Sequence, residues 1–287
     1  MQHFADRLAA AVEGVGSPVC VGLDPVVERL PEALRQRGDD VTAIERFSID
    51  VLDAIAKHAA IVKPQSACYE RYGSAGVAAL QRVIDAAADR GLMVVLDAKR
   101  GDIGISARHY AAATIGRQGI DAVTVSGYLG PDTLEPFVEV ATEAGKGLFV
   151  LVRTSNPGSE AVQSQRLEDG RSVAEAMADL LVERGRSCIG ESGYSAIGAV
   201  VGATHPADLL ALRQRMARQV LLLPGYGAQG ASADDIAPAF DDRGRGAIVT
   251  ASRSVIYPFD PADRDWQTAI AAAAEGFARE VARVARG

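Results

Sequence analysis

Residues 91–104 read GLMVVLDAKRGDIG and place two aspartates and a lysine directly after an apolar run. The run at residues 92–96 predicts a strand that is buried on both faces, because it is apolar throughout and a glycine stops the helix before it. Side chains two residues apart on a strand point the same way, so we expect Asp97 and Lys99 to lie side by side. A second glycine then ends the strand and leaves Asp102 on the following turn.

This charged pair has two interpretations. Asp97 and Lys99 could form an ordinary buried ion pair, which many folds contain and whose desolvation can exceed its Coulombic attraction. They could instead belong to a catalytic site, where charged groups with perturbed pKa values gather. Residues elsewhere in the chain are needed to choose between these two interpretations.

The pattern of strand and helix recurs along the whole chain. Of the 287 residues, 48% are hydrophobic and 23% are charged, which is typical of a globular protein with a sizeable core. Short apolar runs alternate with longer stretches of helical period, which indicates successive βα units around a parallel sheet. The expected strands are residues 18–24, 60–65, 92–99, 122–126, 147–153, 196–201, 220–224 and 247–251.

This series of βα units predicts a single (β/α)8 TIM barrel of the α/β class over residues 1–287. The alternative, a doubly wound open sheet, more often stops at about six strands. Two connections, residues 25–40 and 154–171, are longer than a barrel needs. Both follow a strand, on the side where barrels carry their active sites, so we expect these extended loops to cover a substrate.

Two helices have the clearest amphipathic pattern: residues 74–90 and the last helix of the chain. We expect their apolar stripes to pack on the core. The first stripe consists of Val77, Leu80, Val83, Ile84 and Ala87, and the second of Trp266, Ile270, Phe277, Val281 and Val284.

Composition excludes several classes of protein. The net charge of -7 argues against general affinity for nucleic acid or an anionic membrane, because both need a basic surface. Cys20, Cys68 and Cys188 are odd in number and lack C-x-x-C spacing, so we expect neither a disulfide framework nor a zinc site. No stretch approaches the ~20 apolar residues of a membrane span, and the first residues lack a signal-peptide pattern. We therefore expect a cytoplasmic protein.

Polar residues gather at the expected carboxyl ends of the strands, where barrels place catalytic groups. Any one of them could be a satisfied structural group, but their common location favours a site. The residues are Asp24, Lys63, Asp97, Lys99, Ser155 in RTSNPG (153–158), Ser252 and Arg253, together with the segment PGYGAQG (224–230).

The glycine-rich segment at residues 225–230, GYGAQG, formally matches G-x-G-x-x-G and precedes a helix that we expect to start near Ser232. A dinucleotide fingerprint would mark the first βα turn of a doubly wound sheet, whereas this is the seventh unit. Loops after strands seven and eight of a barrel often bind phosphate through backbone N–H groups. Arg253 would add a charge-assisted contact. We therefore favour phosphate over a nicotinamide cofactor.

Metal chemistry has less support in the sequence. Asp97 and Asp102 could hold Mg²⁺, but Lys63 and Lys99 would compete with the cation. The histidines form no H-x-x-x-H or H-E-x-x-H spacing. They are His3, His58, His109 and His205.

Six motifs together resemble the orotidine 5'-phosphate decarboxylases, in particular the bacterial long-loop (type 2) branch. They are VGLDP (21–25), IVKPQ (61–65), LDAKRGDIG (96–104), RTSNPG (153–158), LLPGYGAQG (222–230) and SRSVIYP (252–258). The resemblance implies a (β/α)8 barrel that converts orotidine 5'-phosphate to uridine 5'-phosphate (UMP) and CO₂ in de novo pyrimidine biosynthesis. It also implies a homodimer without metal or organic cofactor.

The resemblance implies a role for each charged residue of the cluster. Lys99 would be the proton donor to pyrimidine C6, and Asp97 would lie beside the departing carboxyl group. Lys63 would complete a charged tetrad with Asp102, which would come from the neighbouring subunit.

The resemblance also implies the contacts to the nucleoside. Asp24 and Lys63 would hold ribose hydroxyls, and Ser155 would bind the amide edge of the pyrimidine. Ile103 and Ser106 would accompany Asp102 across the dimer interface, Ser106 standing where relatives often have threonine.

At the phosphate, the resemblance implies that Gln229 and Arg253 hold the 5'-phosphate beside Pro224. Ser252 would make at most a backbone contact, because relatives of the other branch often carry glycine there.

Two alternatives remain. A Mg²⁺-dependent phosphosugar decarboxylase of the same barrel group has a similar Asp-x-Lys motif, although Lys63 argues against it. A nucleotide-binding barrel without catalytic activity is the other alternative.

Overall fold

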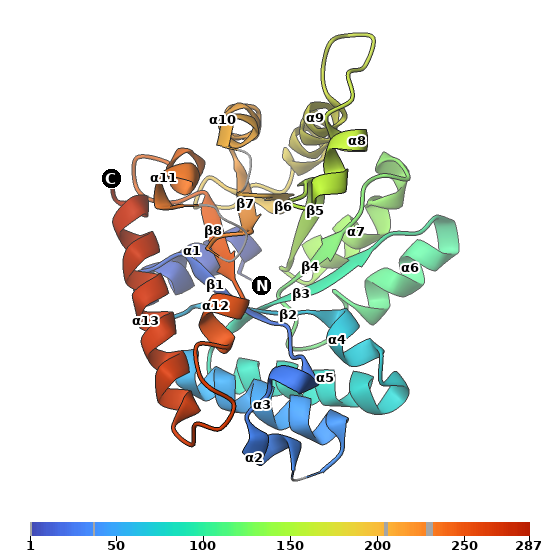
Figure 1. The fold of residues 1–287 in the computed structure, drawn as a ribbon. Helices are drawn as coiled ribbons and strands as arrows, with labels where there is room; N and C mark the ends of the chain where they lie inside the picture. The colour runs from blue at the N-terminus through green and yellow to red at the C-terminus, as the bar shows by residue number, and fades with distance from the viewer. Residues whose placement is uncertain (1, 37, 204–205, 228–231) are drawn as a thin grey trace.

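The computed structural model describes residues 2–36, 38–203, 206–227 and 232–287. Within these residues the strands form a closed parallel barrel in chain order, from β1 to β8 (Figure 1). The strands are β1 Val19–Leu23, β2 Ile61–Pro64, β3 Met93–Arg100, β4 Ala122–Val125, β5 Gly147–Arg153, β6 Ser195–Val201, β7 Gln219–Pro224 and β8 Ala247–Ala251. The expected α/β barrel is confirmed, and every strand lies where its apolar run predicted it.

Helices surround the barrel on its outside (Figure 1). The longer ones are α1 Phe4–Val15, α3 Asp40–Ile55, α5 Gly73–Asp89, α6 Gly104–Ala113, α7 Glu135–Glu143, α9 Val173–Gly185, α10 Pro206–Arg215 and α13 Trp266–Ala285. Short helices fill the connections: η1 Val27–Arg29, α2 Glu32–Arg35, α4 Ser66–Glu70, η2 Pro131–Thr133, η3 Pro157–Ser159, α8 Glu160–Gln163, α11 Ala233–Ile236, η4 Ala237–Ala239 and α12 Arg253–Ile256. None of the helices in the described ranges has the length and apolar character needed to cross a membrane.

The apolar stripe of α13 packs on the core as expected, with Trp266 and Ile270 buried and Val284 partly buried. On α5 the prediction for Val77 is wrong, because 37% of this residue is exposed. The buried position next to it belongs to Gly76, where a Cβ would lie 2.0 Å from the carbonyl oxygen of Tyr69. Helix α4 approaches α5 so closely at this point that a residue with a Cβ would clash, and a glycine lies at the contact.

Both long connections lie at the carboxyl ends of strands, as predicted. Residues 25–40 contain η1 and α2, and residues 154–171 contain η3 and α8. Beyond α8 the chain projects from the barrel as a loop (Figure 1). An antiparallel bridge between Arg166 and Ser172 closes its base, and Ser172 caps α9 through the backbone N–H of Glu175.

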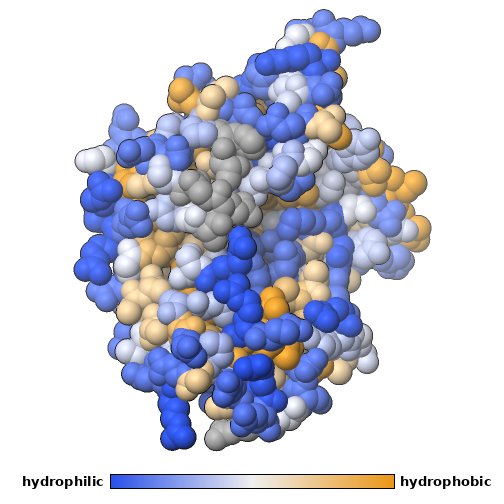
Figure 2. Space-filling model, viewed as in Figure 1, coloured by the Kyte–Doolittle hydropathy of each residue, from blue (hydrophilic) through white to orange (hydrophobic). Residues whose placement is uncertain are grey.

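The surface is mainly hydrophilic, with apolar side chains gathered where α6 begins (Figure 2). Ile103 and Ile105 are 62% and 64% exposed there. Tyr128 and Leu129, which follow β4, are also exposed. Large aliphatic side chains grouped on a surface mark contact sites more often than single exposed residues do.

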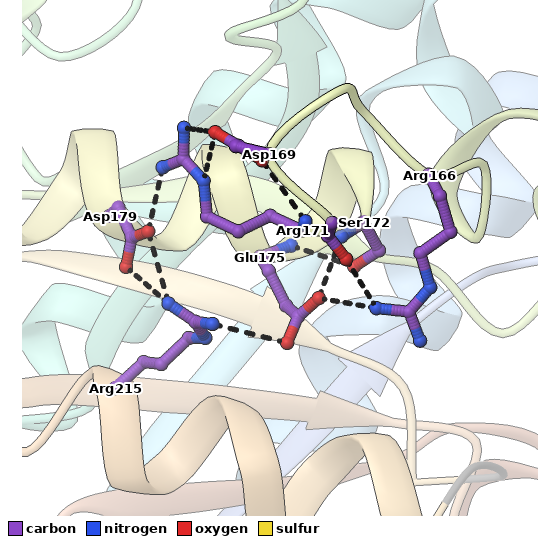
Figure 3. A network of polar contacts seen from close by, with 8 residues as sticks. Arg166, Asp169, Arg171, Ser172, Glu175, Asp179 and Arg215 are labelled. Carbon is purple, nitrogen blue, oxygen red and sulfur yellow. Dashed lines mark hydrogen bonds and ion pairs between the residues drawn. The ribbon is translucent and has the colours of Figure 1, made fainter.

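A network of ion pairs links the projecting loop to α9 and links α9 to α10 (Figure 3). Arg171 pairs with Asp169 of the loop at 2.6 Å and with Asp179 of α9 at 2.8 Å. Arg215 of α10 pairs with the same Asp179 and with Glu175. Single exposed pairs of this kind contribute ~1 kcal/mol or less, so the anchoring depends on their number.

Candidate active site

Asp97 lies between two lysines at the carboxyl end of the barrel. Lys63 Nζ of β2 donates to Asp97 Oδ2 at 2.7 Å, and Lys99 Nζ donates to Asp97 Oδ1 at 2.6 Å. Lys63 and Asp97 are buried, whereas 46% of the Lys99 side chain is exposed. The expected pairing of Asp97 with Lys99 is confirmed, and Lys63 joins it. Lys99 is the more exposed of the two lysines.

The backbone at Lys99 differs from the expected strand. Lys99 is the only residue other than glycine in the described ranges that has a positive φ, at 46°. The pairing of β3 with β4 shifts register between Leu96 and Arg100. Simple alternation of side chains therefore does not explain the contact between Asp97 and Lys99, because a left-handed residue interrupts the strand. Such a conformation costs about 1–2 kcal/mol for a residue with a Cβ.

Thr124 of β4 connects this backbone to the charged cluster, and sequence reasoning missed it. Its hydroxyl accepts a hydrogen bond from the Lys99 N–H at 2.9 Å and donates one to Asp97 Oδ1 at 2.9 Å. The side chain is buried. The available signal was a lone polar residue within the apolar strand AVTV at residues 122–125. Thr124 thus fixes the carboxylate and the left-handed turn relative to each other.

The electrostatics of the cluster favour its charged form. Burial disfavours the Asp97 carboxylate, but attraction by Lys63 and Lys99 outweighs it and holds the pKa of Asp97 well below its usual range. Burial likewise opposes the charge on Lys63, but attraction by Asp97 and Asp24 prevails and raises the pKa of Lys63. Near neutral pH Asp97 is therefore an anion that accepts hydrogen bonds, and the proton donors of the cluster are ammonium groups.

A cavity of about 210 Å³ opens beside the cluster at the ends of several strands. Two buried oxygen atoms on its wall, Asp24 Oδ1 and Thr250 Oγ1, have no hydrogen-bond partner within the described residues. Buried polar atoms are normally paired, so both are available to a ligand. The cavity is lined by Asp24, Lys63, Gln65, Asp97, Pro224, Gly225, Tyr226, Thr250, Ala251, Ser252 and Arg253. Sequence reasoning missed Gln65 and Thr250 in this set.

Residues that we predicted to contact a phosphate lie at the end of the cavity that β7 and β8 form. Ser252 directly precedes α12. A Cβ on Gly22 of β1 would lie 2.0 Å from the Oγ of Ser252, so β1 and the end of β8 lie close together there. Arg253 is exposed and has no ion-pair partner in the described ranges. Gln229 lies outside the described residues. Helix α11 begins directly after Ser232, where we expected a helix to start.

The predicted residues on the turn after β3 do not join the cluster. Asp102 accepts a hydrogen bond from the N–H of Ile103 at 2.8 Å and forms no ion pair in the described part of the chain. Ile103 is exposed, and Ser106 is partly buried on α6. This arrangement leaves the partly buried Asp102 carboxylate without a cationic partner among the described residues.

Ser155 follows β5 but does not line the cavity beside the cluster. Its backbone packs on Gly202, where a Cβ would lie 3.0 Å from the Ser155 nitrogen. The neighbouring Arg153 is fully buried and was not predicted. Its guanidinium donates to Ser159 at 2.6 Å, Glu160 at 2.9 Å and Asp208 of α10 at 2.8 Å. Arg153 therefore fixes the start of the segment that carries Ser155.

The described residues contain no group of three or more His, Cys, Asp or Glu side chains that could hold a metal ion. Both oxygens of Asp97 already accept hydrogen bonds from ammonium groups. The positive charges of these groups would repel a divalent cation.

Comparisons with known proteins agree with this geometry. The profile of the "Orotidine 5'-phosphate decarboxylase / HUMPS family" matches residues 17–264. Orotidine 5'-phosphate decarboxylase of Rhodopirellula baltica is 44% identical over 95% of this chain and 97% of its own. The enzyme of the same name from Deinococcus radiodurans is 47% identical over 88% of this chain and 89% of its own.

Solved structures show the same likeness. A putative orotidine 5'-phosphate decarboxylase from Streptomyces avermitilis has a TM-score of 0.85 and 41% identity, covering 100% of this chain and 96% of its own. The OMP decarboxylase of Leishmania donovani has a TM-score of 0.80 and 31% identity, with 100% of both chains covered. This chain is therefore a decarboxylase, a carbon–carbon lyase, and belongs to the orotidine 5'-phosphate decarboxylase / HUMPS family.

Proposed function

We propose that this protein converts orotidine 5'-phosphate to UMP and CO₂ in de novo pyrimidine biosynthesis, without a metal or organic cofactor. The observation that carries the proposal is the Lys63–Asp97–Lys99 cluster beside a cavity whose other end holds Arg253, which has no ion-pair partner among the described residues. The names of the relatives support the choice of substrate. The three cysteines are free, which suits a reducing cytoplasm.

The reaction needs charge near one carbon atom. When the bond from pyrimidine C6 to the carboxyl group breaks, its electron pair stays on C6 in the plane of the ring, where the π system cannot delocalise it. The Lys99 ammonium stabilises this developing charge, and a proton then moves from Lys99 Nζ to C6. The products are CO₂, UMP and a neutral lysine that regains its proton from water.

Asp97 has two effects on this step, one on Lys99 and one on the carboxylate of the substrate. Its negative charge attracts the Lys99 ammonium group, and it repels the carboxylate of the substrate until CO₂ leaves. One pair of unit charges at ~4 Å contributes roughly 4 kcal/mol at an effective dielectric near 20. Enzymes lower barriers by up to ~23 kcal/mol, so the cluster cannot act alone. Binding of the ribose and phosphate must supply the remainder.

We assign the binding contacts as follows. Asp24, whose buried Oδ1 has no hydrogen-bond partner in the part of the chain that the structure describes, holds a ribose hydroxyl together with Lys63. Arg253 binds the 5'-phosphate, and Ser155 binds the amide edge of the pyrimidine. Gln229 assists at the phosphate beside Pro224, and Ser252 offers its backbone.

We further propose a homodimer in which Asp102 completes the site of the neighbouring subunit. The support is that Asp102 forms no ion pair in its own subunit's described residues and stands next to the exposed Ile103 and Ile105. A second subunit would cover this apolar surface and the partly buried Ser106.

The proposed function is tested by mixing the protein with orotidine 5'-phosphate and following the ultraviolet absorbance of the pyrimidine. We expect the absorbance to change as the carboxyl group leaves, with the same rate after treatment with EDTA. A Mg²⁺-dependent phosphosugar decarboxylase would turn over a sugar-acid phosphate instead and lose activity with EDTA. Tight nucleotide binding without any absorbance change would contradict the proposed reaction and favour a nucleotide-binding barrel without catalytic activity.

Replacement of Arg253 by alanine should lower kcat/KM for orotidine 5'-phosphate by about a hundredfold, because a charge-assisted contact to the phosphate is lost. Turnover of orotidine, which lacks the phosphate, should be slow and equal in both proteins. Arg264→Ala, which removes an exposed arginine outside the cavity, is the matched control. An unchanged kcat/KM in Arg253→Ala would show that Arg253 does not bind the phosphate.

A further inference from the structure

A second and larger cavity lies at the opposite end of the barrel. Its volume is about 480 Å³, compared with about 210 Å³ for the cavity beside the charged cluster. It is enclosed by α1, by the last turn of α13 and by the beginnings of β7 and β8. No residue lines both cavities.

The interior of this cavity is mainly apolar. Val12 contributes from α1, Val220 from β7 and Ile248 from β8, and the ring of Tyr194 forms part of the wall. Val220 and Ile248 are buried, whereas Val12 is half-buried. An apolar cleft of this kind takes up the apolar body of a small molecule.

The rim of the cavity is positively charged. Arg243 and Arg245 lie on the turn before β8, and Arg286 follows the end of α13. The guanidinium groups of Arg243 and Arg286 have no ion-pair partner within the described ranges. Glu13 is the one acidic residue among those that line the cavity. The lining therefore carries an excess of positive charge.

Arg245 is the cation held most firmly in place. Its guanidinium lies 5.9 Å from the centre of the Tyr194 ring and 3.4 Å from Asp241. The hydroxyl of Tyr194 donates to the same Asp241 at 3.0 Å. The Nε atom of Arg245 is nevertheless buried without a hydrogen-bond partner among the described residues. Buried donors are normally paired, and none of the described residues supplies an acceptor for this one.

We propose that this cavity binds a small amphipathic anion, with its apolar body against Val12, Val220 and Ile248 and its anionic group at Arg245. The shape gives no preference between a sulfonate, a carboxylate and a phosphate, which share the chemistry that the arginines recognise. The site is separate from the active site, and the proposal does not depend on the decarboxylase reaction.

Two fluorescent probes test the proposal on the full chain. 1-Anilinonaphthalene-8-sulfonate carries an anionic group, and N-phenyl-1-naphthylamine is the same aromatic body without it. We expect saturable binding of the sulfonate, about tenfold tighter than binding of the uncharged probe, because a charge-assisted hydrogen bond is added. Salt should reduce this difference, since the arginines lie at the surface. Saturating UMP should displace neither probe.

Two variants locate the binding. Arg245→Met should bring the affinity for the sulfonate down to that for the uncharged probe, and Val12→Trp should weaken both probes by filling the cavity. Arg218→Met removes an exposed arginine at the same end of the barrel but outside the cavity, and should change neither affinity. Thermal unfolding and decarboxylation measurements verify that each variant folds, and Ala9→Trp replaces Val12→Trp if that variant does not.

Displacement by UMP would place the probe in the active site and overturn the proposal. Equal affinities of the native protein and both cavity variants would overturn it as well.

Discussion

Replacement of Lys99 by alanine is expected to lower kcat for orotidine 5'-phosphate by on the order of 10⁴-fold or more, because one change removes the proton donor and the charge that stabilises the carbanion. Binding of UMP should persist, because the ribose and phosphate contacts that we assign to Asp24 and Arg253 are unchanged. The measurement is a stopped-time assay of product together with UMP titration.

Lys57→Ala is the matched control, since Lys57 is an exposed lysine with no ion-pair partner in the described ranges. It should retain full activity. If Lys99→Ala lost no more than tenfold in kcat, Lys99 would not be the proton donor. If Lys99→Ala lost both UMP binding and its folded structure, a second variant, Lys99→Arg, would be used. This variant keeps the positive charge and so separates an effect on folding from an effect on catalysis. That variant should fold, bind UMP and remain severely impaired, because a guanidinium does not give up its proton near neutral pH.

Mixing two inactive variants should restore activity if the active site is shared between subunits. Lys99→Ala and Asp102→Ala are each expected to be inactive alone. After exchange of subunits at equal concentration, about a quarter of the sites should contain both native groups, because half of the dimers are hybrid and each hybrid has one intact site. The expected result is therefore about a quarter of the native activity.

Mass spectrometry of the intact complexes must show that hybrids have formed. Mixing Lys99→Ala with Asp97→Ala is the control, because both residues lie in the same subunit's cluster, 2.6 Å apart, and no hybrid site regains both. Hybrids without activity in the first mixture would place Asp102 in the site of its own subunit. A monomer at all concentrations would contradict the proposed dimer.

Most of the barrel could be predicted from the sequence, because parallel strands that are buried on both faces leave continuous apolar runs. Strand β5, for example, covers residues 147–153, as its apolar run predicts. The misplaced Val77 shows the limit of this reasoning. Helical periodicity finds the apolar face of α5, but it does not show that α4 comes close enough to need Gly76 at the contact.

The candidate site could be predicted where a charged residue lies near the carboxyl end of an apolar strand, as Lys63 and Asp97 do. The contacts of Thr124 and Arg153 could not be found this way. Thr124 matters through a hydrogen bond to a neighbouring strand, and Arg153 through partners that are distant in sequence, such as Asp208. Such contacts depend on tertiary packing. The local pattern marks Thr124 as a lone polar residue in an apolar strand, but it does not show which groups the residue contacts.

The left-handed backbone at Lys99 bears on how this enzyme can change over evolution. Natural proteins have about 5–15 kcal/mol of stability to lose, and a conformation that costs 1–2 kcal/mol takes up a noticeable share. Selection for stability alone would place glycine at position 99, which adopts this φ without strain. On the role that we propose for Lys99, selection for its chemistry maintains a lysine there, and a lineage that lost the reaction would be free to gain stability at the same residue.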